Sequence, residues 1–561
     1  MHHGTAGLSV TFNGEIYNYL ELREQLRSAG HFFSTDSDTE VLLAAYANAG
    51  AAALDDLRGM FAFALWDETT RTLTLARDRI GKKPLYYTIE NSCLYFSSCL
   101  DALYQTRKSR WTPSSAAVSQ YLALGYIPAP LTIYHEAKKL EAGTTLSAGP
   151  CGLGKPERYW RPAADLEPFT GTFAQACNRT EELLQEAVRI RLRSDVPLGI
   201  FLSGGIDSSL VAAVAGHECG ADVQTYAVGF DVGSLDESGH AAAVAESLGT
   251  DHRTIRVDPD VMSLLPEFCA HAGEPLASPS ALPLWALAAK ARQHATVILG
   301  GDGGDELFAG YSWYHTAARL ERVRRFAGGD MLQPARGVLA SSMTRMRARS
   351  GVSRRAQRAL DAFAPSTPSA RFAQLRVLFS KRDFAKLSSR DVEYVEAFRV
   401  GSAAFDDAGG DRVRRMRAAD IATYLAESLM PKVDVATMSH ALELRAPLLD
   451  HVLLEWALTL PEHILVDRRG GKRVLRALLD RYVPARLTDR PKQGFSVPLD
   501  SWFRERLAER ANRLGRSDAL EALGLRLSGV AELHAEHLRG ERDHGERLFA
   551  LLVLDEWARA R

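Results

Sequence analysis

The sequence predicts an α+β domain followed by a parallel α/β domain with a largely helical C-terminal part. Residues 8–103 hold short apolar runs divided by turn residues, a pattern typical of antiparallel strands with a few helices. From residue 174 to residue 299, strand-length and helix-length segments alternate, which indicates a doubly wound parallel sheet. Beyond Tyr311 the apolar periodicity is mostly helical.

Three units follow from these patterns. The first is residues 1–107, the second is a connector at 108–167 rich in proline and glycine, and the third is residues 168–561. In the first unit we expect a strand at Leu8–Asn13, helices at Leu20–Ala29 and Thr39–Ala47, and strands at Phe61–Asp67, Thr72–Arg77, Leu85–Ile89 and Cys93–Ser97.

The third unit begins with an expected helix at Ala174–Arg193. The elements expected after it are a strand at Val196–Leu202, a helix after Gly204-Gly205, a strand at Gln224–Phe230, a helix at His240–Leu248, a strand at Arg253–Val257, helices at Val261–Ala272 and Leu282–Gln293, and a strand at Thr296–Leu299. This order repeats strand and helix as a parallel sheet requires.

The composition excludes several classes of protein. Of 561 residues, 46% are hydrophobic and 24% are charged, the balance of a globular chain rather than a disordered one. The 68 basic and 69 acidic side chains leave a net charge of −1, so the overall charge favours neither nucleic acid nor an anionic membrane as a partner. No apolar run is long enough to span a bilayer.

The six cysteines are spread through the chain without a CxxC or CxxxC pair, which indicates free thiols rather than a disulfide framework. The first residues, Met1–Thr5, lack the basic and apolar regions of a signal peptide. We therefore expect a cytoplasmic protein.

The sharpest local signal is the segment Ser203-Gly204-Gly205-Ile206-Asp207-Ser208-Ser209, which follows an apolar strand and opens a helix. Two glycines let the backbone approach a phosphate group, and the helix N-terminus offers unpaired N–H groups to it. The serine hydroxyls add donors, whereas Asp207 would repel phosphate and suits Mg²⁺ that neutralises it. A glycine turn with a serine or aspartate N-cap is the structural alternative. The GK[ST] ending of a Walker loop is absent.

A second glycine-rich segment, Gly300–Phe308, follows the last expected strand. Both segments thus come after strands of one parallel sheet, at the edge where such folds bind ligands. The acidic residues Asp302, Asp305 and Glu306 suit a cation and a reacting amine, and an acidic loop in solvent is the alternative.

These two segments resemble signatures of the asparagine synthetase family. SGGIDSS at 203–209 is similar to the pyrophosphate loop of N-type ATP pyrophosphatases, and GDGGDELFAGY at 301–311 is close to the family's second signature. Lys432–Ser439 with Glu443–His451, and then Arg490–Pro498, resemble its KVDRMSM…EVRxPFLDH and RxKxGFxVP stretches. Four ordered matches imply an α/β Rossmann-like adenine-nucleotide α-hydrolase fold for the third unit.

The family activates a carboxylate as an acyl-adenylate, releases pyrophosphate and then lets an amine attack. The resemblance implies that Asp207 and Asp305 hold Mg²⁺ on the departing pyrophosphate. It assigns contacts with ATP and pyrophosphate to Phe201, Ser203, Gly204, Gly205, Asp207, Ser208, Ser209, Val228, Gly300 and Gly301. Phe201 and Val228 are also plain apolar strand residues, which would be buried in any case.

Three residues take catalytic roles by the same resemblance. Asp302 occupies the family's acidic position that steers the incoming amine. Lys492 would stabilise the charge that develops in the tetrahedral intermediate and on pyrophosphate. Glu443 matches the family's E-x-R segment together with Arg445, and a buried ion pair that braces the helical region is the alternative for these two.

The first unit resembles the class II glutaminase domain, an N-terminal nucleophile fold. Its NGEIYN motif begins at Asn13, and the resemblance gives Asn13 and Gly14 the oxyanion hole. Glu15 and Asp38 match groups that bind glutamine. Two later stretches, MFAFALWD and ARDRIGKKPLYY, also resemble this domain. We therefore expect an α+β domain that is a remnant of an αββα arrangement of layers.

The catalytic cysteine of that domain has no counterpart in this chain. The family's glutaminase uses a cysteine at position one, whose own α-amino group serves as base. Here Met1 precedes His2, and the first cysteine is Cys93. The family's opening strands and its arginine for the glutamine carboxylate are absent as well, so we expect several tens of residues to precede Met1. Two explanations stay open: a start codon assigned too late, or a truncated protein that uses free ammonia.

The sequence thus predicts an ATP- and Mg²⁺-dependent ligase that converts aspartate to asparagine, with ammonia rather than glutamine as the nitrogen source of the chain as written. Gly300 and Gly273 stand where relatives often have serine and aspartate, and because Gly273 lies near the expected acceptor site, the acceptor stays open. One alternative is a tailoring ligase that amidates or cyclises another acid, as β-lactam synthetases do. The other is a non-catalytic nucleotide-binding scaffold. Beyond small molecules, a homodimer is the one assembly that we consider.

Overall fold

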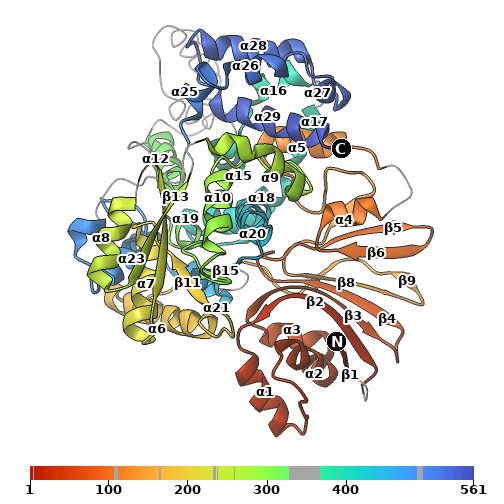
Figure 1. The fold of residues 1–561 in the computed structure, drawn as a ribbon, viewed down its shortest axis with the longest axis vertical. Coiled ribbons are helices and arrows are strands. Elements are labelled where there is room, and N and C mark those ends of the chain that lie inside the picture. Colours follow the sequence, from red (N-terminus) through yellow and green to blue (C-terminus); the bar gives the residue numbers. More distant parts are fainter. Residues whose placement is uncertain are drawn as a thin grey trace.

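The fold is described from a computed structural model of the chain. It describes all residues except 4–5, 107–110, 163–165, 231–235, 237, 258–259, 327–366, 389–390 and 489–496. The expected catalytic Lys492 therefore lies outside the described residues, as does most of the motif around it. Figure 1 shows a β-rich N-terminal body, drawn in red and orange, beside a larger body built on a parallel sheet and many helices.

The N-terminal body contains an antiparallel sheet of order β1-β2-β3-β4-β8-β10, with β9 paired to β8. Its strands are β1 (His2–His3), β2 (Leu8–Ile16), β3 (Gly59–Asp67), β4 (Thr72–Arg77), β8 (Thr144–Gly149), β9 (Gly152–Leu153) and β10 (Glu157–Arg158). A second sheet, of order β6-β5-β7, is formed by β5 (Tyr86–Glu90), β6 (Cys93–Ser97) and β7 (Ala137–Lys139). Strands β7 to β10 lie in the stretch expected as a connector, so this stretch contributes to both sheets.

Helices cover one face of the larger N-terminal sheet. They are α1 (Tyr19–Ser28), α2 (Asp38–Ala49) and α3 (Ala53–Asp56), and two further helices, α4 (Leu100–Gln105) and α5 (Ser115–Leu124), follow later. Leu26 of α1 and Leu42 of α2 are buried with Val10 of β2 and Phe61 and Phe63 of β3. Residues 61 and 63 share one face because side chains alternate along a strand. The helices thus bury the apolar face of the sheet.

The parallel sheet has the order β13-β12-β11-β14-β15, and every neighbouring pair is parallel. Its strands are β11 (Leu198–Phe201), β12 (Gln224–Phe230), β13 (Asp251–Val257), β14 (Val297–Leu299) and β15 (Glu443–Arg445). Helix α6 (Phe173–Arg191) precedes β11. The elements between β11 and β14 are α7 (Ile206–Ala213), the π-helical η2 (Val214–Glu218), α8 (Ser238–Leu248), η3 (Val261–Leu264), α9 (Leu265–Ala272) and α10 (Ala281–Ala291). The predicted fold class is confirmed. The edge strand β15 was not predicted, because three residues are too few to carry a strand periodicity.

The remainder of the described chain is mostly helical. Its elements are α11 (Gly304–Leu307), α12 (Ser312–Phe326), α15 (Pro368–Arg376), α16 (Lys381–Leu387), α17 (Asp391–Glu396), α18 (Arg399–Asp407), α19 (Arg412–Asp420), η5 (Ile421–Leu429), α20 (Met430–Met438), η6 (Pro447–Leu449), α21 (His451–Thr459), α22 (Glu462–Leu465), α23 (Arg473–Leu479), α24 (Ala485–Thr488), α25 (Leu499–Arg504), α26 (Ala508–Leu514), α27 (Asp518–Ala522), α28 (Leu527–Leu538) and α29 (Gly545–Arg559). The segment η5 is π-helical and joins α19 to α20 without a break. Such segments frequently occur at functional sites.

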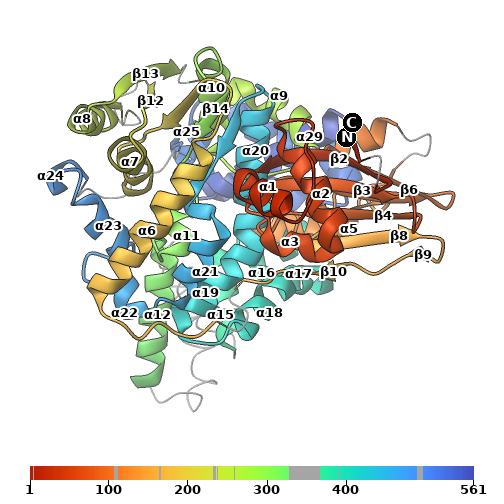
Figure 2. The same ribbon diagram turned by 90° about the horizontal axis from the view of Figure 1, so that it is seen from below.

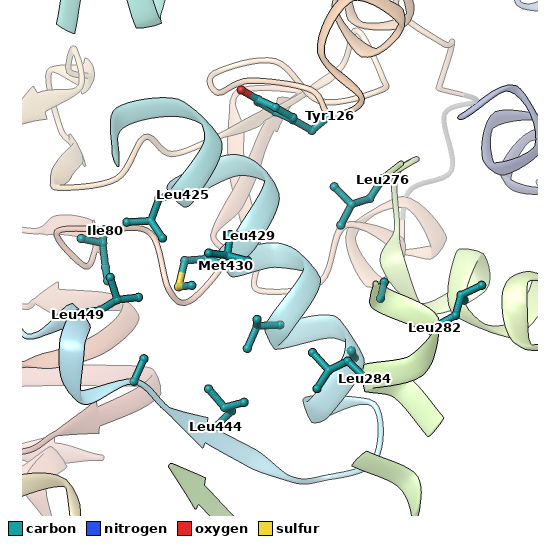
Figure 3. Packing of buried hydrophobic residues seen from close by; sticks show 14 of the residues in the cluster. Ile80, Tyr126, Leu276, Leu282, Leu284, Leu425, Leu429, Met430, Leu444 and Leu449 are labelled. Carbon is teal, nitrogen blue, oxygen red and sulfur yellow. The ribbon is translucent and has the colours of Figure 1, made fainter. Parts of the chain in front are cut away.

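The two bodies lie side by side in both views and share one apolar core (Figures 1 and 2). In the close view of this core, Ile80 of the N-terminal body lies beside Leu449 of η6 (Figure 3). Ion pairs close the same boundary: a guanidinium nitrogen of Arg58 lies 3.0 Å from an oxygen of Asp450, and Nζ of Lys83 lies 2.9 Å from an oxygen of Asp434. The boundary is therefore both apolar and charged.

Candidate active site

The segment Ser203–Ser209 begins as a tight turn after β11, and its last four residues form the start of helix α7. A side chain at Gly204, where φ is +69°, would place its Cβ 2.9 Å from the amide nitrogen of Ala241, so only glycine fits. The N–H of Ser203 donates to Oγ of Ser208 at 3.1 Å, and the N–H of Gly205 donates to Oγ of Ser203 at 3.3 Å. These bonds hold the loop open at the start of the helix.

The loop after β14 packs directly against this first loop. A Cβ at Gly301 would lie 2.7 Å from the amide nitrogen of Ser208, and one at Gly304 would lie 2.3 Å from Oδ1 of Asp207. Real Cβ atoms do not approach that closely, so the two loops can touch only because these positions are glycine. Two segments almost one hundred residues apart in sequence thus form one surface.

Lys472 links the carboxylates of the two loops. Its Nζ lies 2.5 Å from Oδ2 of Asp207 and 2.8 Å from Oδ1 of Asp305. Burial by itself lowers the pKa of Lys472, but the two carboxylates outweigh it and hold that pKa above the ordinary lysine value. Sequence reasoning missed this residue, although its position after Gly470-Gly471 and before α23 was a usable signal.

The donor set at this point fits a divalent cation. Asp207 and Asp305 both bring a carboxylate oxygen within 2.8 Å of a single atom, Nζ of Lys472, so one cation could be shared between them. Carboxylate oxygens beside phosphate oxygens are the ligands that Mg²⁺ prefers. The two aspartates predicted as metal ligands are therefore brought together.

A cavity of about 1070 Å³ opens over the two loops. Of the residues predicted from sequence, its walls include Phe201, Ser203, Gly205, Asp207, Ser208, Val228, Gly300, Gly301, Asp302 and Asp305. Among the described residues predicted to bind ATP or act in catalysis, three do not line it: Gly204 is buried against Ala241, Ser209 is fully buried, and Glu443 lies on β15. The cavity is at the upper end of the size range of ligand pockets.

Further residues on the cavity wall were not predicted from sequence as site residues. They are Tyr311, Trp313, Arg376, Tyr424 and Lys432, among others. Tyr311 and Lys432 belong to the matched motifs, whereas Trp313, Arg376 and Tyr424 stand in stretches without any motif.

Glu306 also lines the cavity and is 1% exposed. The hydroxyl of Tyr311 donates to the Glu306 carboxylate. Burial and the neighbouring charge of Asp305 raise the pKa of Glu306 to about 7, although the tyrosine hydrogen bond opposes this shift. Tyr311 is thereby tied to the residue next to the expected metal ligand Asp305.

The N-terminal body reaches toward the cavity with the loop after β4. The Asp78 carboxylate, 0% exposed, accepts hydrogen bonds from the amides of Lys82 and Lys83, both at 2.9 Å, and this fixes the loop. Nζ of Lys82 is buried without a hydrogen-bond partner among the described residues. Burial lowers the pKa of Lys82 to about 8, and the negative charge of Asp302 opposes that shift. The lysine and the cavity carboxylate therefore interact electrostatically.

The predicted glutamine-binding residues gather at the end of β2. A Cβ at Gly14 would lie 2.1 Å from the carbonyl oxygen of Met60, so the backbone of β2 and β3 is closely apposed there. The amide of Ile16 donates to Oδ2 of Asp38 at 2.9 Å. Asn13 precedes Gly14 on the same strand. The four residues thus lie close together, and their binding role stays a prediction.

Glu15 of this group faces the second body. Arg445 of β15 lies 3.6 Å from its carboxylate and 2.6 Å from that of Glu443. Burial raises the pKa of Glu15 to about 7; Arg445 lowers it, and Asp38 and Glu443 raise it further. The ion pair that the sequence offered for Glu443 and Arg445 is therefore present, and the catalytic role of Glu443 stays a prediction.

All six cysteines lie within the described residues and are free thiols. Among the described helices, none has the length and apolar character needed to cross a membrane.

Comparison with known proteins follows the same division of the chain. The family model of asparagine synthase matches residues 179–559, and that of the glutamine amidotransferase domain matches residues 1–160. Asparagine synthetase [glutamine-hydrolyzing] 1 of Bacillus subtilis (strain 168) is 32% identical over 98% of this chain and 85% of its own length. A putative asparagine synthetase of Mycobacterium tuberculosis (strain ATCC 25618 / H37Rv) is 34% identical, over 98% of this chain and 84% of its own. The amidase chry2 of Gibberella zeae is 28% identical, over 93% of this chain and 82% of its own.

Proposed function

The chain belongs to the asparagine synthase family, which uses ATP, and from that premise we propose that it is an amide-forming ligase that converts aspartate to asparagine. The observation that carries the proposal is the meeting of two loops at the carboxyl edge of the parallel sheet, where Lys472 contacts both Asp207 and Asp305. Such an edge is where open α/β sheets bind nucleotides. The first loop supplies a helix N-terminus for phosphate.

In the first step, an oxygen of the β-carboxylate of aspartate attacks the α-phosphorus of ATP. The bond from that phosphorus to the bridging oxygen breaks, and pyrophosphate leaves with the bonding electrons. The N–H groups and hydroxyls of Ser203–Ser209 and the ammonium of Lys472 would stabilise the charge that grows on pyrophosphate. Mg²⁺ held by Asp207 and Asp305 would, when bound, neutralise further phosphate charge.

In the second step, the lone pair of ammonia forms a bond with the acyl carbon. The nitrogen loses a proton, and AMP departs with the former carboxylate oxygen. Asp302, on the cavity wall beside the phosphate loop, is the residue we assign to orienting the amine. Lys492 is proposed to stabilise the same intermediate, from outside the described residues. The attacking species is ammonia whether it arrives as ammonium or is released from glutamine near Asn13 and Glu15.

The direct test is pyrophosphate release by this chain with ATP, Mg²⁺ and aspartate, comparing ammonium with glutamine, and with asparagine identified as the product. Turnover with ammonium supports the ligase, and turnover with glutamine supports a working glutaminase in addition. The variant Asp207→Asn should lose about 100-fold or more in rate, because Mg²⁺ would lose one of its two proposed carboxylate ligands. Its matched control is Asp222→Asn, an exposed carboxylate outside the cavity. No pyrophosphate with any carboxylate tested would contradict the proposal.

A second candidate function is favoured by one observation. Relatives that cover nearly the whole chain include proteins named amidases, such as chry2. The acceptor could therefore be another carboxylate, activated and amidated in a biosynthetic pathway. A panel of carboxylic acids decides between the two: a kcat/KM for another acid above that for aspartate would favour this candidate.

A further inference from the structure

One wall of the cavity is built from aromatic rings. Tyr311 stacks on Trp313 with ring centroids 3.9 Å apart and an interplanar angle of 18°. Tyr424, on the π-helical η5, meets Trp313 at 90° with centroids 6.3 Å apart. These rings line the cavity together with Arg376, the last residue of α15. Three separate segments thus form one wall.

Arg376 is held rigidly in the corner between two of these rings. Its guanidinium carbon lies 4.1 Å from the centroid of Trp313 and 4.1 Å from that of Tyr424. Its Nε lies 3.3 Å from Oδ1 of Asp420, and the other oxygen of that carboxylate accepts from Nε1 of Trp313 at 2.9 Å and from the hydroxyl of Tyr314 at 2.8 Å. A guanidinium fixed by stacking and by one ion pair loses little entropy when it binds a further group.

The terminal nitrogens of Arg376 have donors to spare. Five N–H groups project from a guanidinium, and in the described part of the chain no hydrogen bond joins the terminal nitrogens of Arg376 to a protein acceptor. The side chain is only 15% exposed, yet it lines the cavity. A buried cation that offers paired N–H groups to a cavity suits a carboxylate, which accepts both at once.

The ring wall connects Arg376 to the reacting end of the cavity. Tyr311, one ring layer beyond Trp313, donates to Glu306, and Glu306 follows the expected metal ligand Asp305 in sequence. The wall that holds Arg376 therefore begins beside the phosphate loops, and both line the same cavity. Aspartate carries two carboxylates, one to react and one to be held.

We propose that Arg376 binds the non-reacting carboxylate of the acceptor, so that the site selects an acid with a second carboxylate over a monocarboxylic acid. This assignment rests on the proposed function. The cavity then places the acceptor's reacting carboxylate at the phosphate loops. Trp313, Tyr424 and Asp420 are positioning residues for Arg376.

The test compares L-aspartate with its α-amide, which keeps the reacting β-carboxylate and lacks only the second negative charge. Pyrophosphate release gives kcat/KM for both acceptors in the wild type, in Arg376→Gln and in Arg376→Lys. The wild type should prefer aspartate by about 100-fold or more, as expected when a buried charged partner is left unpaired. In Arg376→Gln this preference should fall to within about threefold, because aspartate loses its partner and the amide loses nothing. Arg376→Lys keeps the charge beside Asp420 and should retain part of the preference.

Two controls separate the outcomes. Arg382→Gln removes an exposed arginine of α16 and should leave the preference unchanged. The KM for ATP and the melting temperature of each variant show whether its cavity and fold are intact. A wild type without preference, or a folded Arg376→Gln that keeps it, overturns the assignment while leaving the ligase in place. A wild type that releases no pyrophosphate with aspartate overturns the proposed function, and this assignment with it.

Discussion

The two ends of the cavity are built in different ways. The phosphate end consists of two continuous loops, Ser203–Ser209 and Gly300–Asp305, closed by a single added side chain, Lys472. The wall that we propose binds the acceptor, called the acceptor end, consists of Trp313 of α12, Arg376 of α15 and Tyr424 of η5, each from a separate segment. A loop at the end of a strand can bind phosphate through its backbone, and the strand order alone brings two such loops together. An acceptor site depends on side chains, so it can be assembled from any segments that meet.

Because the two ends are built separately, substitutions at one end should leave the function of the other end intact. Lesions at the phosphate end should reduce adenylation of every carboxylate, whereas lesions at the acceptor end should change the choice among carboxylates.

The largest effect is expected for Lys472→Met. The substitution removes the cation between Asp207 and Asp305 and leaves two neighbouring carboxylates without it. We expect kcat for pyrophosphate release to fall about 100- to 1000-fold with every acceptor, the scale of losing one group that stabilises developing charge. Steady-state assays with aspartate and its α-amide give the result, with Lys155→Met, an exposed lysine, as control. A loss confined to one acceptor would contradict the separation.

Gly301→Ala should have the next largest effect. Its Cβ would lie 2.7 Å from the amide nitrogen of Ser208 and push the two loops apart. Displacing reacting groups by about 1 Å can cost about 100-fold, so we expect kcat to fall by about 10- to 100-fold. Gly239→Ala, where a Cβ meets nothing within 4 Å, is the control and should be neutral. An unchanged kcat would mean that the loops do not work as one surface.

Trp313→Leu tests the acceptor end without touching Arg376 itself. It removes the ring beside the guanidinium and the hydrogen bond to Asp420 at 2.9 Å. A cation–π contact and a hydrogen bond are together worth about 2 kcal/mol, so KM for aspartate should rise by up to about 30-fold. KM for ATP should stay within about twofold of the wild type, since the substitution leaves the residues of both phosphate loops unchanged. Trp66→Leu, at an exposed tryptophan, serves as control. An equal rise in both KM values would break the comparison.

The smallest effect on ammonium-dependent turnover is expected at the N-terminal pocket, for Glu15→Gln. Burial raises the pKa of Glu15 from 4.5 to about 7. Between these two pH values the folded state therefore keeps a proton on Glu15 that the unfolded state has released. Stability from this group is present below pH 4.5 and is lost as the pH rises through 7. The variant should therefore be more stable than the wild type at pH 8 by about 1–2 kcal/mol, and the difference should vanish near pH 4. Urea unfolding at the two pH values measures it, and a variant less stable at pH 8 would refute the charge assignment.

Much of the fold could be predicted from sequence because its signals are local. Alternating strands and helices from Ala174 to Leu299 predict the parallel sheet, and β12 has the predicted bounds. The edge strand β15 is three residues long and depends on β14 for its conformation. No alternation of apolar and polar residues in the sequence therefore predicts it. The stretch 108–167 contributes β8 to the N-terminal sheet despite its proline and glycine content, because pairing with β4 decides the conformation there.

The candidate site divides in the same way. Asp207, Asp305 and Asp302 stand in motifs, and the structure brings all three to one cavity. Arg376 and Trp313 carry no motif, and their meeting depends on the packing of α12, α15 and η5. Lys472 lies between these cases, since a glycine pair precedes it but its partners are some 170 residues or more away in sequence.

The central claim is that this chain activates the carboxylate of its acceptor by transferring AMP to it, and isotope transfer tests that claim most directly. Aspartate labelled with ¹⁸O in its β-carboxylate is turned over with ATP, Mg²⁺ and ammonium, and the phosphorus products are analysed by mass. The account predicts one ¹⁸O atom in AMP and none in pyrophosphate, because the attacking oxygen stays on the α-phosphorus. Label in orthophosphate, or unlabelled AMP alongside newly formed asparagine, would contradict it.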